Sequence, residues 1–238
     1  VSVDALGIGK GDEVIVPTFT IISCLNQIIR SGAKPILIDS NPITWNMDTS
    51  QIEKKINKRT RAIVAVHIYG ITVDIDPILD LAKKYNLFVI EDAAESIGQN
   101  YKDKPCGSFG DISTFSFYPN KHITTGEGGM IFTDDANVAE ECKKLRNLYF
   151  NNKNRFVHDK LGWNFRMTNI QAAIGLAQLE NLDEVLIKKR KVGNLYFKNL
   201  SKIDSLQMPP LSTNYCSNLF WVFGILIKDY MSFNSKLL

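Results

Sequence analysis

Short apolar runs rich in Val and Ile alternate with helix-like segments along residues 13–148, and this rhythm constrains the fold most. Runs this short, apolar at consecutive positions, are typical of strands buried on both faces. The alternation favours an α/β fold, with a mostly parallel sheet covered by helices on both faces. The predicted strands are Glu13–Val16, Pro35–Asp39, Ala62–Val66, Phe88–Glu91, Ser113–Phe117 and Met130–Thr133. The predicted helices between or after them are Ile21–Arg30, Ile75–Tyr85 and Ala136–Leu148.

The pattern changes after Thr168, where a long helical segment covers Ile170–Leu200. It contains the basic run Lys188–Lys191, which we interpret as a solvated helix face in preference to a site for an anionic ligand. Two prolines follow, and Asn218–Ile227 predicts a strand of a new unit. The predicted parts are a large domain over 1–167, a connecting helix over 168–200 and the start of a small C-terminal domain over 201–238.

Composition excludes several classes of protein. The chain has 238 residues, of which 45% are hydrophobic and 22% charged, as in globular proteins. A net charge of +3 indicates neither a nucleic-acid nor a membrane surface, and no segment approaches the roughly 20 apolar residues of a membrane helix. There is no initiator Met and the chain stops abruptly at 235–238, so we expect a fragment.

The cysteines and histidines carry no metal-ligand pattern. Four scattered cysteines without a CxxC pair indicate neither a zinc site nor a disulfide framework, and they suit a reducing cytoplasm. The three histidines also lack ligand spacing, so we expect no metal. His67 ends a predicted strand, and we favour a packed, hydrogen-bonded histidine there over a catalytic one. A dinucleotide or P-loop site is disfavoured because neither glycine fingerprint follows a strand.

Two segments at the ends of predicted strands carry candidate chemistry, because open α/β sheets bind ligands at that edge. Asp92 emerges from a buried strand and needs a cation or a donor, although a helix N-cap explains it equally well. Lys121 follows a turn with Pro119 and precedes the glycine-rich Thr125–Gly129. Such a lysine can act as an amine nucleophile, but taken alone an exposed loop lysine is the favoured interpretation.

A third segment, Gly162–Thr168, interleaves polar residues and aromatics ahead of a capped helix. This arrangement can serve a phosphate or an interface. Taken alone, a helix entry with aromatics in the core is the safer interpretation.

Together these motifs are more specific than any one of them. They are GDEVIVPTFT from Gly11, VHIYG from Val66, VIEDAAESIG from Val89, TFSFYPNKHITTGEGG from Thr114 and GWNFRMTNIQAAIG from Gly162. In this order the chain resembles the DegT/StrS family of pyridoxal-phosphate-dependent sugar aminotransferases, most closely its perosamine-synthase-like members. The resemblance covers nearly the whole chain, and SFxxxKxxTTGEGG is its most specific element.

The resemblance implies the fold-type I aminotransferase architecture and pyridoxal 5'-phosphate as cofactor. It implies that Lys121 binds the cofactor covalently and later moves the substrate proton. Asp92 would keep the pyridine nitrogen protonated, so that the ring acts as an electron sink. Glu95 would lie near the ring hydroxyl, and Ser116 would bind the cofactor phosphate.

Two further residues follow from the resemblance. Asn164 matches a residue that reaches the phosphate of the partner's cofactor, which implies a homodimer with shared active sites. Ile21 stands where the family has an aromatic residue stacked on the cofactor ring, so an aliphatic contact would replace stacking. The family's first phosphate-binding segment would lie upstream of Val1.

The implied reaction is a transamination in two halves. The amino donor would be L-glutamate, and the acceptor would be C4 of a nucleotide-linked 4-keto-6-deoxy sugar used for cell-surface polysaccharide. We favour GDP-4-keto-6-deoxymannose, with a UDP- or dTDP-linked keto sugar as the alternative. A non-catalytic, regulatory relative is a second hypothesis, against which the intact Lys121, Asp92 and Ser116 argue.

Overall fold

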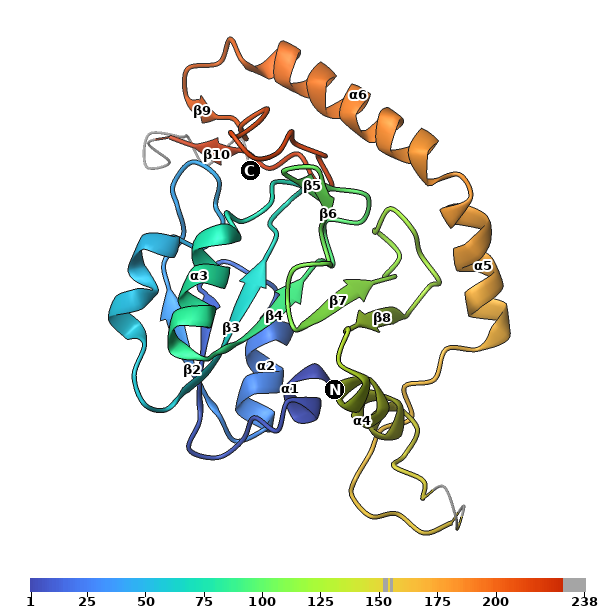
Figure 1. The fold of residues 1–238 in the computed structure, drawn as a ribbon. Coiled ribbons are helices and arrows are strands. Elements are labelled where there is room, and N and C mark those ends of the chain that lie inside the picture. Colours follow the sequence, from blue (N-terminus) through green and yellow to red (C-terminus); the bar gives the residue numbers. More distant parts are fainter. Residues whose placement is uncertain (152–153, 155, 229–238) are drawn as a thin grey trace, which may run out of the picture.

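A six-stranded sheet with the strand order β2-β1-β3-β4-β7-β8 forms the centre of the computed structural model, which describes residues 1–151, 154 and 156–228 (Figure 1). The first five strands in that order pair in parallel, and β8 pairs antiparallel to β7. The predicted α/β class and all six predicted strands are therefore confirmed. Their bounds are β1 (Glu13–Pro17), β2 (Lys34–Ile38), β3 (Thr60–Val66), β4 (Phe88–Asp92), β7 (Ile112–Ser116) and β8 (Gly129–Phe132).

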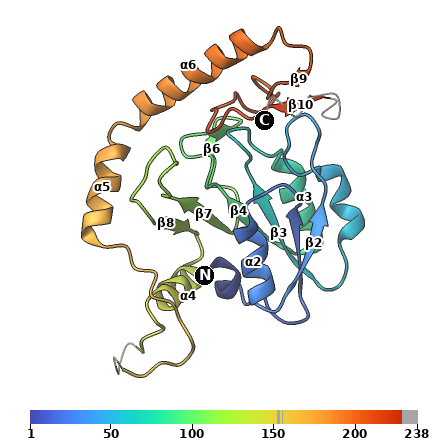
Figure 2. The same ribbon diagram turned by 180° about the vertical axis from the view of Figure 1, so that it is seen from behind.

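Helices cover both faces of this sheet, because successive side chains of a strand point to opposite sides. Val14 and Val16 pack with α1 (Ser2–Ala5), α2 (Ile22–Arg30) and α4 (Ala136–Arg146) on one face. Ile15 points to the opposite face, which is covered by α3 (Asp76–Tyr85) and by the 3-10 turns η1 (Thr49–Gln51) and η2 (Glu53–Lys55). Figures 1 and 2 show α3 and α2 on opposite sides of the sheet. Each central strand is thus buried on both faces, as its continuous apolar run predicts.

The predicted connecting helix is two helices, α5 (Asn169–Leu179) and α6 (Leu182–Leu200). Thr168 opens α5 with a capping box that it shares with Gln171. The break falls at Asn181, whose side-chain amide donates to the Ala177 carbonyl at 2.9 Å and so satisfies an end of α5. An asparagine that can bond its own backbone competes with the helix, which explains the interruption of a continuous apolar pattern.

The basic run of α6 is only partly solvated. Lys188 and Lys191 are exposed, but Lys189 and Arg190 are half-buried. The Lys189 ammonium donates to the Trp221 carbonyl oxygen at 3.2 Å. The interpretation of this run as a solvated helix face is therefore wrong for Lys189, because α6 lies against the C-terminal segment.

The expected strand over 218–227 is also wrong. Only β10 (Leu226–Ile227) forms there, paired with β9 (Leu206–Gln207), and a second small hairpin joins β5 (Asn100–Tyr101) to β6 (Lys104–Pro105). Phe220 has a φ of 55°, which interrupts an extended chain. The stretch before β10 crosses the carboxyl ends of the sheet strands instead (Figure 1). Residues 229–238 of the predicted small-domain segment lie outside the described residues, and the three-part division stays a prediction.

Across the described ranges, none of the helices has the length and apolar character needed to cross a membrane.

Shortening a core side chain on the α3 face tests this two-sided packing. Ile15 is fully buried, so Ile15→Ala should lower the free energy of unfolding by about 2–5 kcal/mol through lost burial and an unfilled cavity. Ile29→Ala is the control, because Ile29 is 57% exposed and should cost well under about 1 kcal/mol. Urea unfolding of the three proteins measures the difference. Equal losses for both variants would contradict the packing described.

Candidate active site

The candidate site lies at the carboxyl ends of β4 and β7. Asp92 is the last residue of β4 and Ser116 the last of β7. Asp92 pairs with Thr114, two residues before Ser116, so both side chains belong to the sheet face that α2 covers. Lys121 follows in a turn, in which its N–H donates to the Tyr118 carbonyl at 3.0 Å. Parallel strand direction therefore brings the predicted residues to one edge.

Two donors hold the Asp92 carboxylate. Oδ1 accepts the Ala94 N–H at 3.0 Å, and Oδ2 accepts the thiol of Cys24 at 3.1 Å. Burial raises the pKa of Cys24 well above its usual range, and the neighbouring Asp92 charge adds to this, so the thiol stays protonated and donates. The residues between β4 and β5 form turns and not a helix, so the helix N-cap interpretation of Asp92 is wrong.

The Lys121 amine is half-buried and faces charge of the opposite sign. Burial lowers its pKa, while the carboxylates of Glu95 and Asp92 act in the raising direction. Nζ also lies 3.8 Å from the centroid of the Trp221 ring. The isolated motif favoured an exposed loop lysine, and this interpretation is wrong because the Lys121 amine is half-buried.

Glu95 completes the charged group around the amine. Its Oε2 accepts the backbone N–H of Tyr69 at 2.9 Å, and Tyr69 holds that N–H in place with a φ of 57°. Burial raises the pKa of Glu95. Glu95 therefore takes up a proton at a higher pH than an ordinary glutamate does, and its protonation removes a negative charge that faces Lys121.

The other predicted site residues are Ser116, Asn164 and Ile21. The Ser116 hydroxyl oxygen accepts the Tyr118 N–H at 3.3 Å, which places a hydroxyl and a turn at the end of β7. Asn164 is exposed on the segment between α4 and α5, and its Oδ1 accepts from Arg166 Nε at 2.8 Å. Ile21 is 59% exposed at the N-cap of α2. The structure thus joins Asp92, Glu95 and Lys121, while Asn164 and Ile21 face outward from their own elements.

Two residues of the site were missed from the sequence. Cys24 sits in the first turn of α2, and the signal for it was a polar side chain just after β1, at the same sheet edge as Asp92. Trp221 lies in the irregular stretch that was expected to be a strand. Neither shares a local motif with the residue it contacts.

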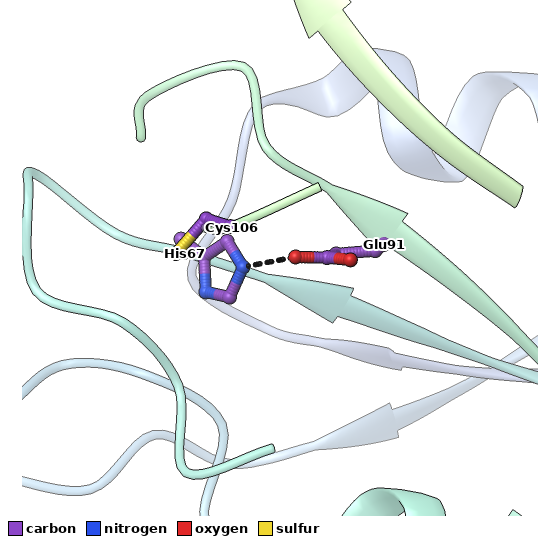
Figure 3. A group of neighbouring side chains, drawn as sticks. All are labelled: His67, Glu91 and Cys106. Atoms are coloured by element: carbon purple, nitrogen blue, oxygen red, sulfur yellow. Dashed lines mark hydrogen bonds and ion pairs between the residues drawn. The ribbon is translucent and has the colours of Figure 1, made fainter. Parts of the chain in front are cut away.

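A second buried cluster lies on the opposite face of the sheet, next to the site (Figure 3). Glu91, fully buried, accepts from His67 Nε2 at 2.9 Å, from the Phe109 N–H at 2.9 Å and from the Ser113 hydroxyl at 3.4 Å. The Gly107 and Gly110 N–H groups donate to it as well. This one carboxylate ties the ends of β3, β4 and β7 to the loop before β7.

The side chains of His67, Glu91 and Cys106 offer ligand atoms within 4.8 Å of one another, a spacing that a metal ion could bridge. However, the Val73 N–H donates to His67 Nδ1 at 3.1 Å, so Nδ1 is an acceptor and Nε2 carries the proton given to Glu91. Nδ1 of His67 and both carboxylate oxygens of Glu91 therefore already accept hydrogen bonds. The cluster is a hydrogen-bonded network, and the prediction of a packed, hydrogen-bonded His67 is confirmed.

The fold and the site together define an α/β protein with a half-buried lysine at the carboxyl edge of a mostly parallel sheet. Comparison with known proteins identifies its family. The sequence matches the DegT/DnrJ/EryC1/StrS aminotransferase family over residues 1–237. The chain belongs to this family.

Individual relatives agree with this assignment. The chain is 48% identical over 224 residues to GDP-perosamine synthase of Escherichia coli O157:H7, a match that covers 94% of this chain and 61% of the relative. The aminotransferase TlmJ from Streptoalloteichus hindustanus has a TM-score of 0.90 at 29% identity, covering 95% of this chain and 62% of that one. NtdA from Bacillus subtilis has a TM-score of 0.84 at 32% identity, covering 95% and 52%. The chain spans about three fifths of the perosamine synthase it matches, and the expected aminotransferase architecture is confirmed.

Neutralising Glu91 tests the buried network through acid stability. Burial acts to raise the pKa of Glu91, but the hydrogen bonds from His67, Gly107 and Phe109 outweigh it and hold the pKa below the ordinary value of 4.5. A lowered folded pKa means that the stabilisation is fully present above the unfolded pKa and is lost as the pH falls through the folded value. Glu91→Gln should therefore flatten the acid limb below about pH 4.5, and it should cost about 3 kcal/mol at pH 7.

Unfolding free energies measured by urea between neutral and acidic pH check this expectation. Glu53→Gln is the matched control, because Glu53 also has a lowered pKa but pairs with Lys84 at the exposed surface. An acid limb as steep in Glu91→Gln as in the unaltered protein would contradict the role assigned to Glu91.

Proposed function

We propose that the full-length protein is a pyridoxal-phosphate-dependent aminotransferase that moves an amino group from L-glutamate to C4 of a nucleotide-linked 4-keto-6-deoxy sugar. The observation that carries this is the half-buried Lys121 amine facing Asp92 and Glu95 at the carboxyl edge of the sheet. Similarity to a GDP-perosamine synthase supports GDP-4-keto-6-deoxymannose as the acceptor, and we propose cell-surface polysaccharide as the destination of the product. A UDP- or dTDP-linked sugar is the alternative. All four cysteines are free thiols, which suits a reaction in the cytoplasm.

The residues of the site fit the cofactor by their chemistry. Pyridoxal phosphate presents an aldehyde, a pyridine nitrogen, a ring hydroxyl and a phosphate. The chain offers an amine in Lys121, an oriented carboxylate in Asp92, a second carboxylate in Glu95 and a hydroxyl in Ser116. The related NtdA was solved with bound pyridoxamine phosphate, the amino form of the same cofactor. When bound, the cofactor supplies an electron sink and carries the amino group between the two halves of the reaction.

Lys121 and Asp92 would have different roles in the reaction. Burial favours the neutral Lys121 amine, which is the nucleophilic form, and this amine would hold the cofactor through its aldehyde. The same Nζ would move the proton at the α-carbon of the amino donor. Asp92 would keep the pyridine nitrogen protonated, and the donors from Cys24 and Ala94 fix the direction of its carboxylate.

A second copy of the chain is the partner that we propose. Helix α5 has an apolar, exposed face, on which Ile170 is 74% and Ile174, one turn later, 48% exposed. Polar side chains fasten the helix to the glycine-rich loop: Gln171 Nε2 donates to the Glu127 carbonyl at 3.1 Å, and Gln178 Nε2 to that of Thr124 at 2.7 Å. A dimer would cover the apolar face and let the exposed Asn164 reach the partner's site.

The cofactor test uses the full-length protein and pyridoxal phosphate. The unaltered protein should develop the visible absorption band of lysine-bound cofactor, and borohydride should fix the cofactor to Lys121, as located by peptide mass spectrometry. Lys121→Ala should lose both signals. Lys160→Ala is the control, because Lys160 is an exposed lysine paired with Glu141. A band that persists in Lys121→Ala would contradict the proposal.

The reaction test supplies glutamate with GDP-, UDP- and dTDP-linked 4-keto-6-deoxy sugars in turn. Mass spectrometry should show an amino sugar with the GDP-linked substrate, and Lys121→Ala should reduce its formation by at least about 10³-fold. Amination of another nucleotide's sugar selects the alternative acceptor. No amino sugar from any of the three would favour the non-catalytic, regulatory hypothesis.

A charge on the apolar face of α5 tests the dimer. Ile170→Lys should shift the protein from dimer to monomer in analytical ultracentrifugation, because it buries an unpaired charge in the interface. Ile187→Lys on α6 is the matched control, since Ile187 is 66% exposed outside that face. A monomeric unaltered protein, or the same shift in both variants, would contradict the proposed interface.

A further inference from the structure

The side chain of Trp221 contacts Lys121 from a part of the chain that is 100 positions away. The lysine Nζ lies 3.8 Å from the centroid of the indole ring, within the range of a cation–π contact. Trp221 belongs to the irregular stretch between α6 and β10, which Figure 2 shows over the carboxyl ends of the sheet strands. The ring therefore closes one side of the site from outside the strand-and-helix body that carries the lysine.

A second contact links the same side chain to the turn before the lysine. The indole Nε1–H donates to the carbonyl oxygen of Asn120 at 3.0 Å. Lysine has a long, flexible side chain that samples many rotamers, so one contact at the amine leaves the turn free to move. Contacts to the amine and to the backbone one residue earlier fix both ends of the lysine.

The position of the ring is built into the fold. The Leu219 N–H donates to the Gly70 carbonyl at 3.0 Å, and Lys189 Nζ donates to the Trp221 carbonyl at 3.2 Å. Gly70 has a φ of 100°, and a Cβ there would lie 2.7 Å from the Phe220 nitrogen and 2.8 Å from the Trp221 nitrogen. Only glycine allows this close approach, which seats the stretch against the turn after β3.

We infer that Trp221 is a positioning residue for Lys121, holding the amine toward the cofactor position by its ring face and the lysine turn by its N–H group. This inference rests on the proposed function, because Lys121 is the residue that would bind the cofactor. The ring favours the ammonium form, since its face attracts a cation. Burial acts in the opposite direction, so the ring offsets part of the desolvation of the amine.

Three other titratable groups act on the Lys121 amine or lie beside it. Asp92 from β4 and Glu95 from the following turn act to raise the pKa of Lys121. His122 is adjacent, and burial, aided by Lys189 and Lys121, lowers its pKa to about 4, so it is neutral at physiological pH. These groups remain in a Trp221 variant, and a shift in the titration of Lys121 therefore reports the ring.

The test measures the titration of Lys121 in full-length, cofactor-free protein, by competitive labelling with acetic anhydride across pH and peptide mass spectrometry. Trp221→Leu keeps an apolar side chain but removes the ring, and it should lower the labelling midpoint by about one pH unit. Trp221→Phe keeps a ring and should restore most of the shift. Phe223→Leu is the matched control, because Phe223 stacks on Phe220 and Tyr196 in the same region.

A midpoint that is unmoved in Trp221→Leu, or moved equally in Phe223→Leu, would overturn the inference. With the proposed substrates, Trp221→Leu should also lower kcat by roughly tenfold or more while KM for glutamate changes little. Equal kcat values in the unaltered protein and Trp221→Leu would overturn it as well. The labelling needs no cofactor, so a shifted midpoint in a protein that does not bind pyridoxal phosphate would refute the proposed function and leave the Trp221 contact standing.

Discussion

The buried carboxylate of Glu91 is the interaction on which the site edge of the sheet depends. It accepts hydrogen bonds from His67 after β3, from Ser113 on β7 and from N–H groups of the loop between β6 and β7. A buried anion without such donors would be very costly, so these strand ends and the loop must stay together for the protein to fold. Because successive residues of a strand face opposite sides, fixing Glu91 on one face directs Asp92 to the other.

On that other face, residues at the edge of the sheet are each contacted by a residue from another part of the chain. Cys24 from α2 orients Asp92, and Trp221 from the C-terminal stretch contacts Lys121. Burial and the two carboxylates act in opposite directions on the Lys121 amine. An amine whose pKa is lowered by burial and that faces two carboxylates suits a residue that must act as a nucleophile and also carry a proton.

Much of the fold could be predicted because its signals are local. Continuous apolar runs identified all six strands of the sheet, and the helical pattern from Ala136 identified α4. Predictions were wrong where a single local side chain or a tertiary contact overrode the pattern. A self-capping Asn181 divides the expected long helix, and the expected strand at Asn218 folds against the turn at Gly70, through bonds such as Leu219 N–H to the Gly70 carbonyl.

The sequence by itself determined the strand and helix rhythm, the strand-end positions of Asp92 and Ser116, and the motif around Lys121, because each follows from periodicity or from a short run of neighbours. Only the tertiary structure decided the surroundings that give these residues their properties. Cys24 lies 68 positions from Asp92, and Trp221 lies 101 positions from Asn120. Such contacts arise when parallel strands end at one edge and a distant segment crosses it, so no local pattern announces them.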